Sequence, residues 1–322
     1  MSAAPPRLVI DPAQFSPAAV SDETRAFNAA LAERSQGPGL AETGLDEMRS
    51  GRMFPKPPPS PRAIDRTIPG PDGAPLAVRI IAPENPVGAY LHLHMGGLVF
   101  GSADGQDARL EQIADRTGLA CVSVEYRLAP EHPWPAAWDD SEAAVLWLAA
   151  NVVSEFGGDR LAIGGESAGA TLAVPTLVRM RDRHGFTGFS AAALTFGNYD
   201  TTGSPSNHWN GRQGMIIREA DIAFCTSCYA PDPATRRDPD MSAIHADLHG
   251  LPAALFTVGT LDCFLDDSLF MAARWAAAGN HAELAVYPGA VHGFTAFPYA
   301  LAEEANARID AFLKDRLGDQ PD

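Results

Sequence analysis

The sequence contains few cysteines, few basic residues and no long apolar run. Four cysteines in 322 residues are too few for a disulfide framework. Lys and Arg number 24 against 40 Asp and Glu, a net charge of −16, which repels phosphate backbones and excludes nucleic acid as a partner. A membrane span needs about eighteen consecutive apolar residues, and none occurs. Since the N-terminus also lacks the apolar stretch of a signal peptide, we expect a cytoplasmic protein.

The composition is that of a folded globular chain. Hydrophobic residues make up 46 % of the sequence and charged residues 20 %. No repeat of fixed period is present, which excludes solenoids and propellers. The length predicts one large domain with an appendage.

The first fifty residues differ from the remainder of the chain. Apolar residues occur at helical spacing, at Phe15, Val20, Phe27 and Leu31. A proline-rich stretch then follows at 55–61. We therefore expect residues 1–54 to form a helical segment joined to the main domain by a stiff linker.

After the linker, short apolar runs alternate with longer stretches that could form helices. The runs that predict strands are 77–82, 88–93, 119–126, 161–164, 191–196, 253–258 and 283–287. Crossover connections of this length favour a largely parallel sheet with helices on both faces. The first of these strands is expected to pair antiparallel with residues 64–68.

The interval from about 199 to 251 breaks this alternation. It is rich in Gly, Pro, Asn and Asp and contains one helical stretch near 219–229. Because it is too long for a simple loop, we predict an insertion above the sheet, assigned to residues 200–245. The main domain then consists of residues 62–199 and 246–322.

A Gly-x-Ser-x-Gly motif occupies residues 165–169, with Ser167 at its centre. A buried strand is predicted directly before it and a helix from Ala168 onward. This is the setting of a nucleophile elbow, where a tight turn lifts the serine hydroxyl out at a helix N-terminus and tolerates only small neighbours.

A serine hydroxyl needs a base and a carboxylate that orients the base. His292 follows the last predicted strand and Asp262 follows the strand before it. The order Ser, Asp, His is that of α/β-hydrolases. Asp266 and Asp267 compete with Asp262, but we expect them to favour the N-terminus of the next helix. The other histidines are expected at the surface, apart from two that alternate on one strand.

The run 94–98 leaves the strand 88–93 and contains Gly96 and Gly97. Glycine lets the backbone approach a substrate closely, so N–H groups of this run can face an oxyanion together with the N–H of Ala168.

Several blocks of the sequence resemble the hormone-sensitive-lipase-like esterases, bacterial family IV of the α/β-hydrolase superfamily. His94-Met-Gly-Gly-Leu98 is similar to the His-Gly-Gly-Gly-Phe block of that family, and residues 126–140 match the block that follows its next strand. Residues 165–169 match Gly-Asp-Ser-Ala-Gly, and residues 262–267 resemble Asp-Pro-Leu-x-Asp-Glu. The agreement at many points in the same order, ending at Val291-His-Gly-Phe294, makes the resemblance specific.

The resemblance implies an α/β-hydrolase fold whose helical cap comes from residues 1–54 and 200–245. It implies that Gly96 and Gly97 donate to the oxyanion and that Met95, in place of the first glycine, does not. Met95 and Leu98 are expected to shape the substrate pocket, and Glu166, where the family more often has Asp, to lie beside it. No cofactor or metal is implied, and homodimers are common in the family.

The sequence thus predicts a serine carboxylesterase acting on short- to medium-chain acyl or aryl esters, with Ser167, His292 and Asp262 as its triad. An amidase, deacetylase or arylformamidase using the same residues is an open alternative, because the motifs do not distinguish an alcohol leaving group from an amine. A non-enzymatic ligand receptor is disfavoured because His292 is present. A redox or metal role for the CxxC formed by Cys225 and Cys228 is a minor alternative.

Overall fold

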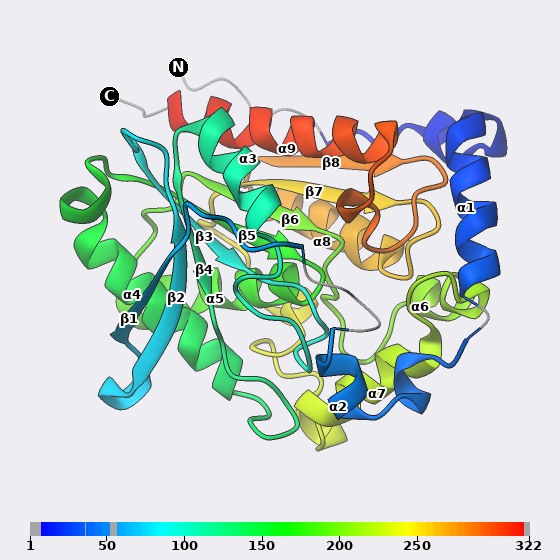
Figure 1. The fold of residues 1–322 in the computed structure, drawn as a ribbon, viewed down its shortest axis with the longest axis horizontal. Helices are drawn as coiled ribbons and strands as arrows, with labels where there is room; N and C mark the ends of the chain where they lie inside the picture. The colour runs from blue at the N-terminus through cyan, green and yellow to red at the C-terminus, as the bar shows by residue number, and fades with distance from the viewer. Residues whose placement is uncertain (1–7, 36, 52–56, 319–322) are drawn as a thin grey trace.

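The computed structural model describes residues 8–35, 37–51 and 57–318 and is built around one eight-stranded sheet (Figure 1). The strand order is β1-β2-β4-β3-β5-β6-β7-β8. Strand β2 pairs antiparallel with both β1 and β4, and every other pairing is parallel. The mostly parallel sheet predicted from the sequence is therefore confirmed.

All the predicted strands are present, with ends that differ by a few residues. The strands are β1 (Ile64–Pro69), β2 (Pro75–Ile81), β3 (Gly88–Leu93), β4 (Ala120–Val124), β5 (Arg160–Glu166), β6 (Ala191–Thr195), β7 (Ala253–Gly259) and β8 (Ala282–Tyr287). The antiparallel pairing of β1 with β2, Ile64 opposite Ile80, is also confirmed. The predicted strand 119–126 is shorter than expected, because the chain leaves the sheet after Val124, and β5 continues to Glu166.

Helices cover both faces of the sheet, as predicted. Helices α3 (Asp107–Thr117) and α9 (Ala300–Gly318) pack on one face, in a core cluster that includes Ile113 and Leu313. Helices α4 (Ala136–Phe156), α5 (Ala168–His184) and α8 (Leu265–Ala277) pack on the other, in a cluster that includes Leu148 and Trp275. The central strands are buried from both sides, which is why their sequences are predominantly apolar on both faces. Among the described residues, no helix combines the length and the apolar character that crossing a membrane requires.

The N-terminal segment and the insertion lie at the same end of the molecule (Figure 1). The first contributes α1 (Asp22–Arg34) and α2 (Leu45–Arg49), with short 3-10 turns at 12–15, 17–19 and 40–42. The insertion contributes α6 (Pro205–Trp209) and α7 (Glu219–Tyr229), with 3-10 turns at 211–213, 233–235 and 243–245. Helix α7 coincides with the predicted helical stretch. Residues 1–7, 36 and 52–54 of the expected N-terminal segment, and 55–56 of the expected linker, lie outside the described residues.

A buried carboxylate holds the start of the insertion. Asp267, in the first turn of α8, accepts hydrogen bonds from the backbone N–H groups of Tyr199 and Asp200 at 2.8 and 2.9 Å and from the Ser204 hydroxyl at 2.5 Å. Its neighbour Asp266 accepts one from the N–H of Ser206 at 2.8 Å. Both acids thus lie in the helix N-terminal turn, as expected, but their carboxylates bind the chain that enters the insertion.

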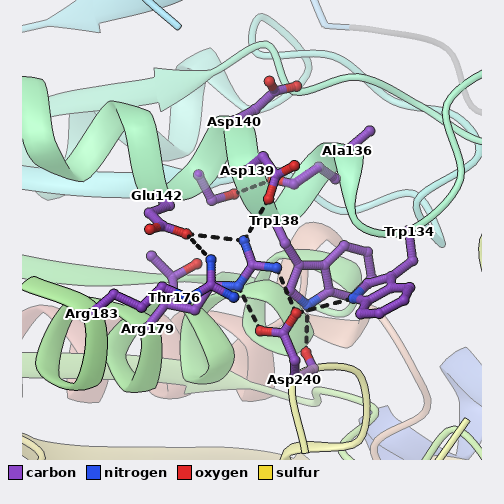
Figure 2. Close-up of polar contacts among 12 residues, drawn as sticks. Trp134, Ala136, Trp138, Asp139, Asp140, Glu142, Thr176, Arg179, Arg183 and Asp240 are labelled. Atoms are coloured by element: carbon purple, nitrogen blue, oxygen red, sulfur yellow. Dashed lines mark hydrogen bonds and ion pairs between the residues drawn. The ribbon is translucent and has the colours of Figure 1, made fainter. Parts of the chain in front are cut away.

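A second, partly buried network holds the end of the insertion (Figure 2). The Arg179 guanidinium of α5 donates two hydrogen bonds of 2.5 Å to the carboxylate of Asp240. The indole N–H groups of Trp134 and Trp138 donate to the carboxylate and the carbonyl of Asp240, at 3.1 and 2.7 Å. Arg179 also pairs with Asp139 of α4 at 2.8 Å. The insertion is therefore fixed to the core at both ends.

Candidate active site

Ser167 lies between the end of β5 and the start of α5, at φ 53° and ψ −115°. Its N–H donates to the carbonyl of Thr195 on the neighbouring strand at 2.9 Å, which holds the turn in this strained conformation with positive φ. A Cβ on Gly165 or Gly169 would lie 2.0 or 1.7 Å from the carbonyl oxygen of Leu93. The strand-turn-helix setting predicted for the motif is present, and sterics explain why glycine flanks the serine.

Three polar side chains from separate loops meet at the carboxyl edge of the sheet. The Oγ of Ser167 lies 2.9 Å from Nε2 of His292, and the carboxylate oxygens of Asp262 lie 3.1 and 3.2 Å from Nδ1 of the same ring. Since an ionised carboxylate only accepts, the hydrogen-bond pattern assigns the proton to Nδ1 and leaves Nε2 to accept from the serine hydroxyl. All three residues are buried, and Asp262 is fully inaccessible.

The imidazole is held by packing as well as by hydrogen bonds. The rings of Phe196 and Phe264 contact it edge to face, with centroids at 4.9 and 5.2 Å. The N–H of Phe264 also donates to Oδ1 of Asp262 at 2.8 Å, so the carboxylate is oriented from two sides. Oriented in this way, Asp262 can keep the imidazole in one tautomer.

Among the described residues, one group of metal-ligating side chains comes together, formed by Asp262, Cys263 and His292. Both ring nitrogens of His292 are already engaged, with Asp262 and Ser167. Asp262 and His292 therefore fit a proton-transferring series that ends at Ser167.

The loop between β3 and α3, residues 94–106 and called the glycine loop below, presents backbone N–H groups beside the serine. Gly96 and Gly97 have φ of 130° and 59°, conformations that favour glycine. No acceptor among the described residues takes a hydrogen bond from the N–H groups of Gly96, Gly97 or Ala168. The N–H of Met95 instead donates a hydrogen bond to Oε1 of Gln106 at 3.2 Å. This agrees with the expectation that Met95 is not an oxyanion donor.

A cavity of about 2040 Å³ adjoins Ser167 and His292. The residues expected at the pocket all line it, namely Met95, Leu98 and Glu166. Apolar side chains of the N-terminal segment and of the insertion complete the wall; they include Leu31, Leu40, Met48, Met215, Ile216, Ile222, Cys225 and Tyr229. The two appended segments thus enclose the space in front of the serine.

The CxxC cysteines lie on α7, one buried and one partly buried, and both are free thiols. Burial raises the pKa of the Cys225 thiol to about 12 and also raises the pKa of Cys228. A raised pKa disfavours the thiolate that redox chemistry requires. The Sγ of Cys225 would lie 2.9 Å from a Cβ on Gly97, so the insertion packs directly against the glycine loop.

Two contacts near the site escaped the sequence-based prediction. Arg49 of α2 donates to the carbonyls of Val99 and Ala129 at 2.9 Å each, which fixes the N-terminal segment to the glycine loop. His92, expected only to alternate with its neighbour on a strand, is fully buried and hydrogen-bonded to Glu166. No sequence motif marks a hydrogen bond to a backbone carbonyl, so the Arg49 contacts could not be predicted. A histidine within an otherwise apolar strand, however, indicates a buried side chain that needs a polar partner.

Comparison with known proteins matches residues 90–296 to a family described as having the alpha/beta hydrolase fold. The chain belongs to this α/β-hydrolase family. Esterase LipI of Mycobacterium tuberculosis is 33 % identical over 279 residues, covering 80 % of this chain and 83 % of that protein. An ethyl acetate hydrolase of Pseudomonas putida is 31 % identical over 237 residues, 69 % of this chain and 72 % of that one.

Solved structures of α/β-hydrolases share the whole architecture. The hyperthermophilic esterase of the archaeon Pyrobaculum calidifontis superposes with a TM-score of 0.82 at 31 % identity, covering 92 % of this chain and 99 % of that one. These comparisons confirm the family resemblance and the fold that the sequence blocks predicted.

Proposed function

We propose that this α/β-hydrolase is a serine carboxylesterase that hydrolyses small carboxylic esters through an acyl-enzyme. The observation that carries the proposal is the hydrogen-bonded series Ser167, His292, Asp262, with N–H groups of Gly96, Gly97 and Ala168 that have no acceptor among the described residues. Relatives named esterase, carboxylesterase and ethyl acetate hydrolase support it.

In this mechanism the Ser167 oxygen attacks the ester carbonyl while Nε2 of His292 takes the hydroxyl proton. Asp262 stabilises the imidazolium that forms. The N–H groups of the glycine loop and of Ala168 bind the oxyanion. His292 then protonates the departing alcohol, and a water molecule repeats the two steps on the acyl-enzyme, releasing the acid and restoring Ser167.

Short and medium acyl or aryl esters are the proposed substrates. The cavity wall is mainly apolar, and the relatives' names include acetyl esterase and ethyl acetate hydrolase.

The residues 8–51 and 200–245 are proposed as a cap, since side chains from both segments line the cavity. A cytoplasmic location and a homodimer stay predictions; fractionation of the source cells and analytical ultracentrifugation test them.

The experiment is a series of p-nitrophenyl esters from acetate to decanoate, measured with the wild-type protein and Ser167→Ala. We expect turnover that peaks at a short or medium chain and falls at least about 10³-fold in the variant, as for loss of a triad nucleophile. Ser154→Ala, which removes an exposed hydroxyl that donates to the Asn151 carbonyl at 2.9 Å, is the matched control. Full activity of Ser167→Ala would refute the mechanism.

Amide hydrolysis is the second function to distinguish, because the same residues perform it. Comparing the turnover of an aryl ester with that of an anilide carrying the same acyl group distinguishes the two functions.

A function of the CxxC motif is tested by changing Cys225 and Cys228 together to Ser. If the motif is functional, the double variant loses activity, whereas the esterase proposal predicts that turnover of esters survives.

A further inference from the structure

A continuous series of buried and partly buried polar groups lies behind the glycine loop. The Oγ of Ser123 lies 2.9 Å from Nδ1 of His92, and Nε2 of His92 donates to Oε2 of Glu166 at 3.1 Å. The same carboxylate oxygen accepts from the amide nitrogen of Gln106 at 2.6 Å. The amide oxygen of Gln106 in turn accepts the backbone N–H of Met95. The series therefore ends on the backbone of the loop itself.

The carboxylate sets the direction of every hydrogen bond in this series. Burial would raise the pKa of Glu166, but the donors His92 and Gln106 outweigh burial and lower it, so the group is ionised near neutral pH. An ionised carboxylate only accepts, so Gln106 must turn its NH₂ group toward Glu166 and its oxygen toward Met95. With a neutral residue at 166 this orientation of the Gln106 amide is no longer imposed.

The two ends of the series flank the reacting groups. Glu166 directly precedes Ser167, and Met95 directly precedes Gly96. Their strands β5 and β3 are neighbours, with Leu93 paired to Gly165. Hydrogen bonds across this junction therefore fix the spacing between the nucleophile and the glycine N–H groups.

We propose that Glu166 is a positioning residue for the oxyanion hole: acting through Gln106, it holds the Met95 backbone so that the N–H groups of Gly96 and Gly97 face the oxygen of the bound carbonyl. This inference rests on the proposed esterase function. It goes beyond the role of a pocket-lining side chain, because Glu166 acts through Gln106 on the backbone that carries the oxyanion donors.

The test uses Glu166→Gln and Gln106→Leu, singly and combined, with p-nitrophenyl butyrate as substrate. Each single variant should lower kcat about 10- to 100-fold and leave KM within about 3-fold, because small displacements of oxyanion donors affect the transition state more than substrate binding. Because both residues act through one connection, the double variant should be no slower than the slower single variant. Gln106 is partly exposed, so its substitution keeps the test valid if Glu166→Gln fails to fold.

Glu125→Gln is the matched control. Its carboxylate accepts the N–H of Ala103 at 2.7 Å, so it holds the same loop at a point beyond the glycines. We expect turnover within about 2-fold of the wild type. As a second readout, the inhibition constant of butylboronic acid, which forms a tetrahedral adduct with a serine, should rise in parallel with the loss of kcat/KM in the Glu166 and Gln106 variants.

The outcomes separate the two proposals. Loss of activity in Ser167→Ala together with unchanged kcat and boronate inhibition in Glu166→Gln and Gln106→Leu would overturn the positioning role and leave the esterase proposal standing. Additive losses in the double variant, or an equal loss in Glu125→Gln, would also overturn it. Full activity of Ser167→Ala would remove the function on which the inference rests.

Discussion

Replacing Arg49 by Met should detach the N-terminal segment from the glycine loop. Arg49 ends α2, and its guanidinium donates to the carbonyls of Val99 and Ala129 in addition to pairing with Glu131. Met48 on the same helix is 2 % exposed and lines the cavity. The substitution keeps an unbranched apolar stem but removes every hydrogen-bond donor of the side chain.

The size of the effect follows from the contacts. A hydrogen bond from a charged donor contributes about 1.5–3 kcal/mol, and the Arg49 side chain is 29 % exposed, so about 1 kcal/mol for each of the two carbonyl bonds is reasonable. The exposed Glu131 pair is left out of this sum. A loss of about 2 kcal/mol in docking free energy corresponds to roughly a 30-fold change in an equilibrium constant. We therefore expect kcat/KM for p-nitrophenyl butyrate to fall by about 5- to 30-fold.

Glu131→Gln is the matched variant, since it weakens the ion pair and keeps both carbonyl bonds of Arg49. It should retain at least half of the wild-type kcat/KM in the same steady-state assay. If Arg49→Met were equally active, the N-terminal segment would not depend on this contact, and its assignment to the cap would lose its main structural support.

Two further substitutions test the elements that hold the site. Burial raises the pKa of Asp267 from 3.8 to about 6, so the folded protein binds this proton more tightly than the unfolded chain, and the free energy of unfolding loses about 3 kcal/mol as pH rises through this interval. About 2 kcal/mol of that loss falls between pH 4.5 and 7.5. Asp267→Asn, which still offers an acceptor to the N–H groups of Tyr199 and Asp200, should lack this part of the loss when urea unfolding is measured at the two pH values; an unchanged pH dependence would contradict the assignment. Gly169→Ala places a Cβ 1.7 Å from a backbone oxygen and should yield unfolded or inactive protein, whereas Gly44→Ala, with open space around it, should match the wild type in thermal unfolding and turnover.

The sequence predicted those features whose cause is local. Strand β3 reads as an apolar run because helices cover both its faces. Gly165 and Gly169 can be recognised as a sequence motif because a turn this tight excludes any side chain. The order Ser167, Asp262, His292 predicted the meeting of three loops, since the carboxyl ends of parallel strands lie along one edge of the sheet.

Contacts between distant segments could not be predicted in the same way. Arg49 and Val99 are 50 positions apart, and a carbonyl acceptor is common to every residue type. Asp267 was correctly expected in a helix N-terminal turn, but its partners depend on where the insertion passes in three dimensions. The role of Gln106 depends equally on its distance from Glu166, and nothing in the motif encodes that distance.

The anchors at the two ends of the insertion determine where this scaffold can be remodelled. Asp267 fastens residues 199–204, and the Arg179 network fastens Asp240, so both junctions are rigid parts of the core. Any hinge that admits a substrate must then lie between them or in the N-terminal segment. A foreign insertion transplanted between residues 208 and 236 would keep both junctions and exchange only the part of the pocket wall that the insertion contributes, which makes this interval the natural target for redesigning selectivity.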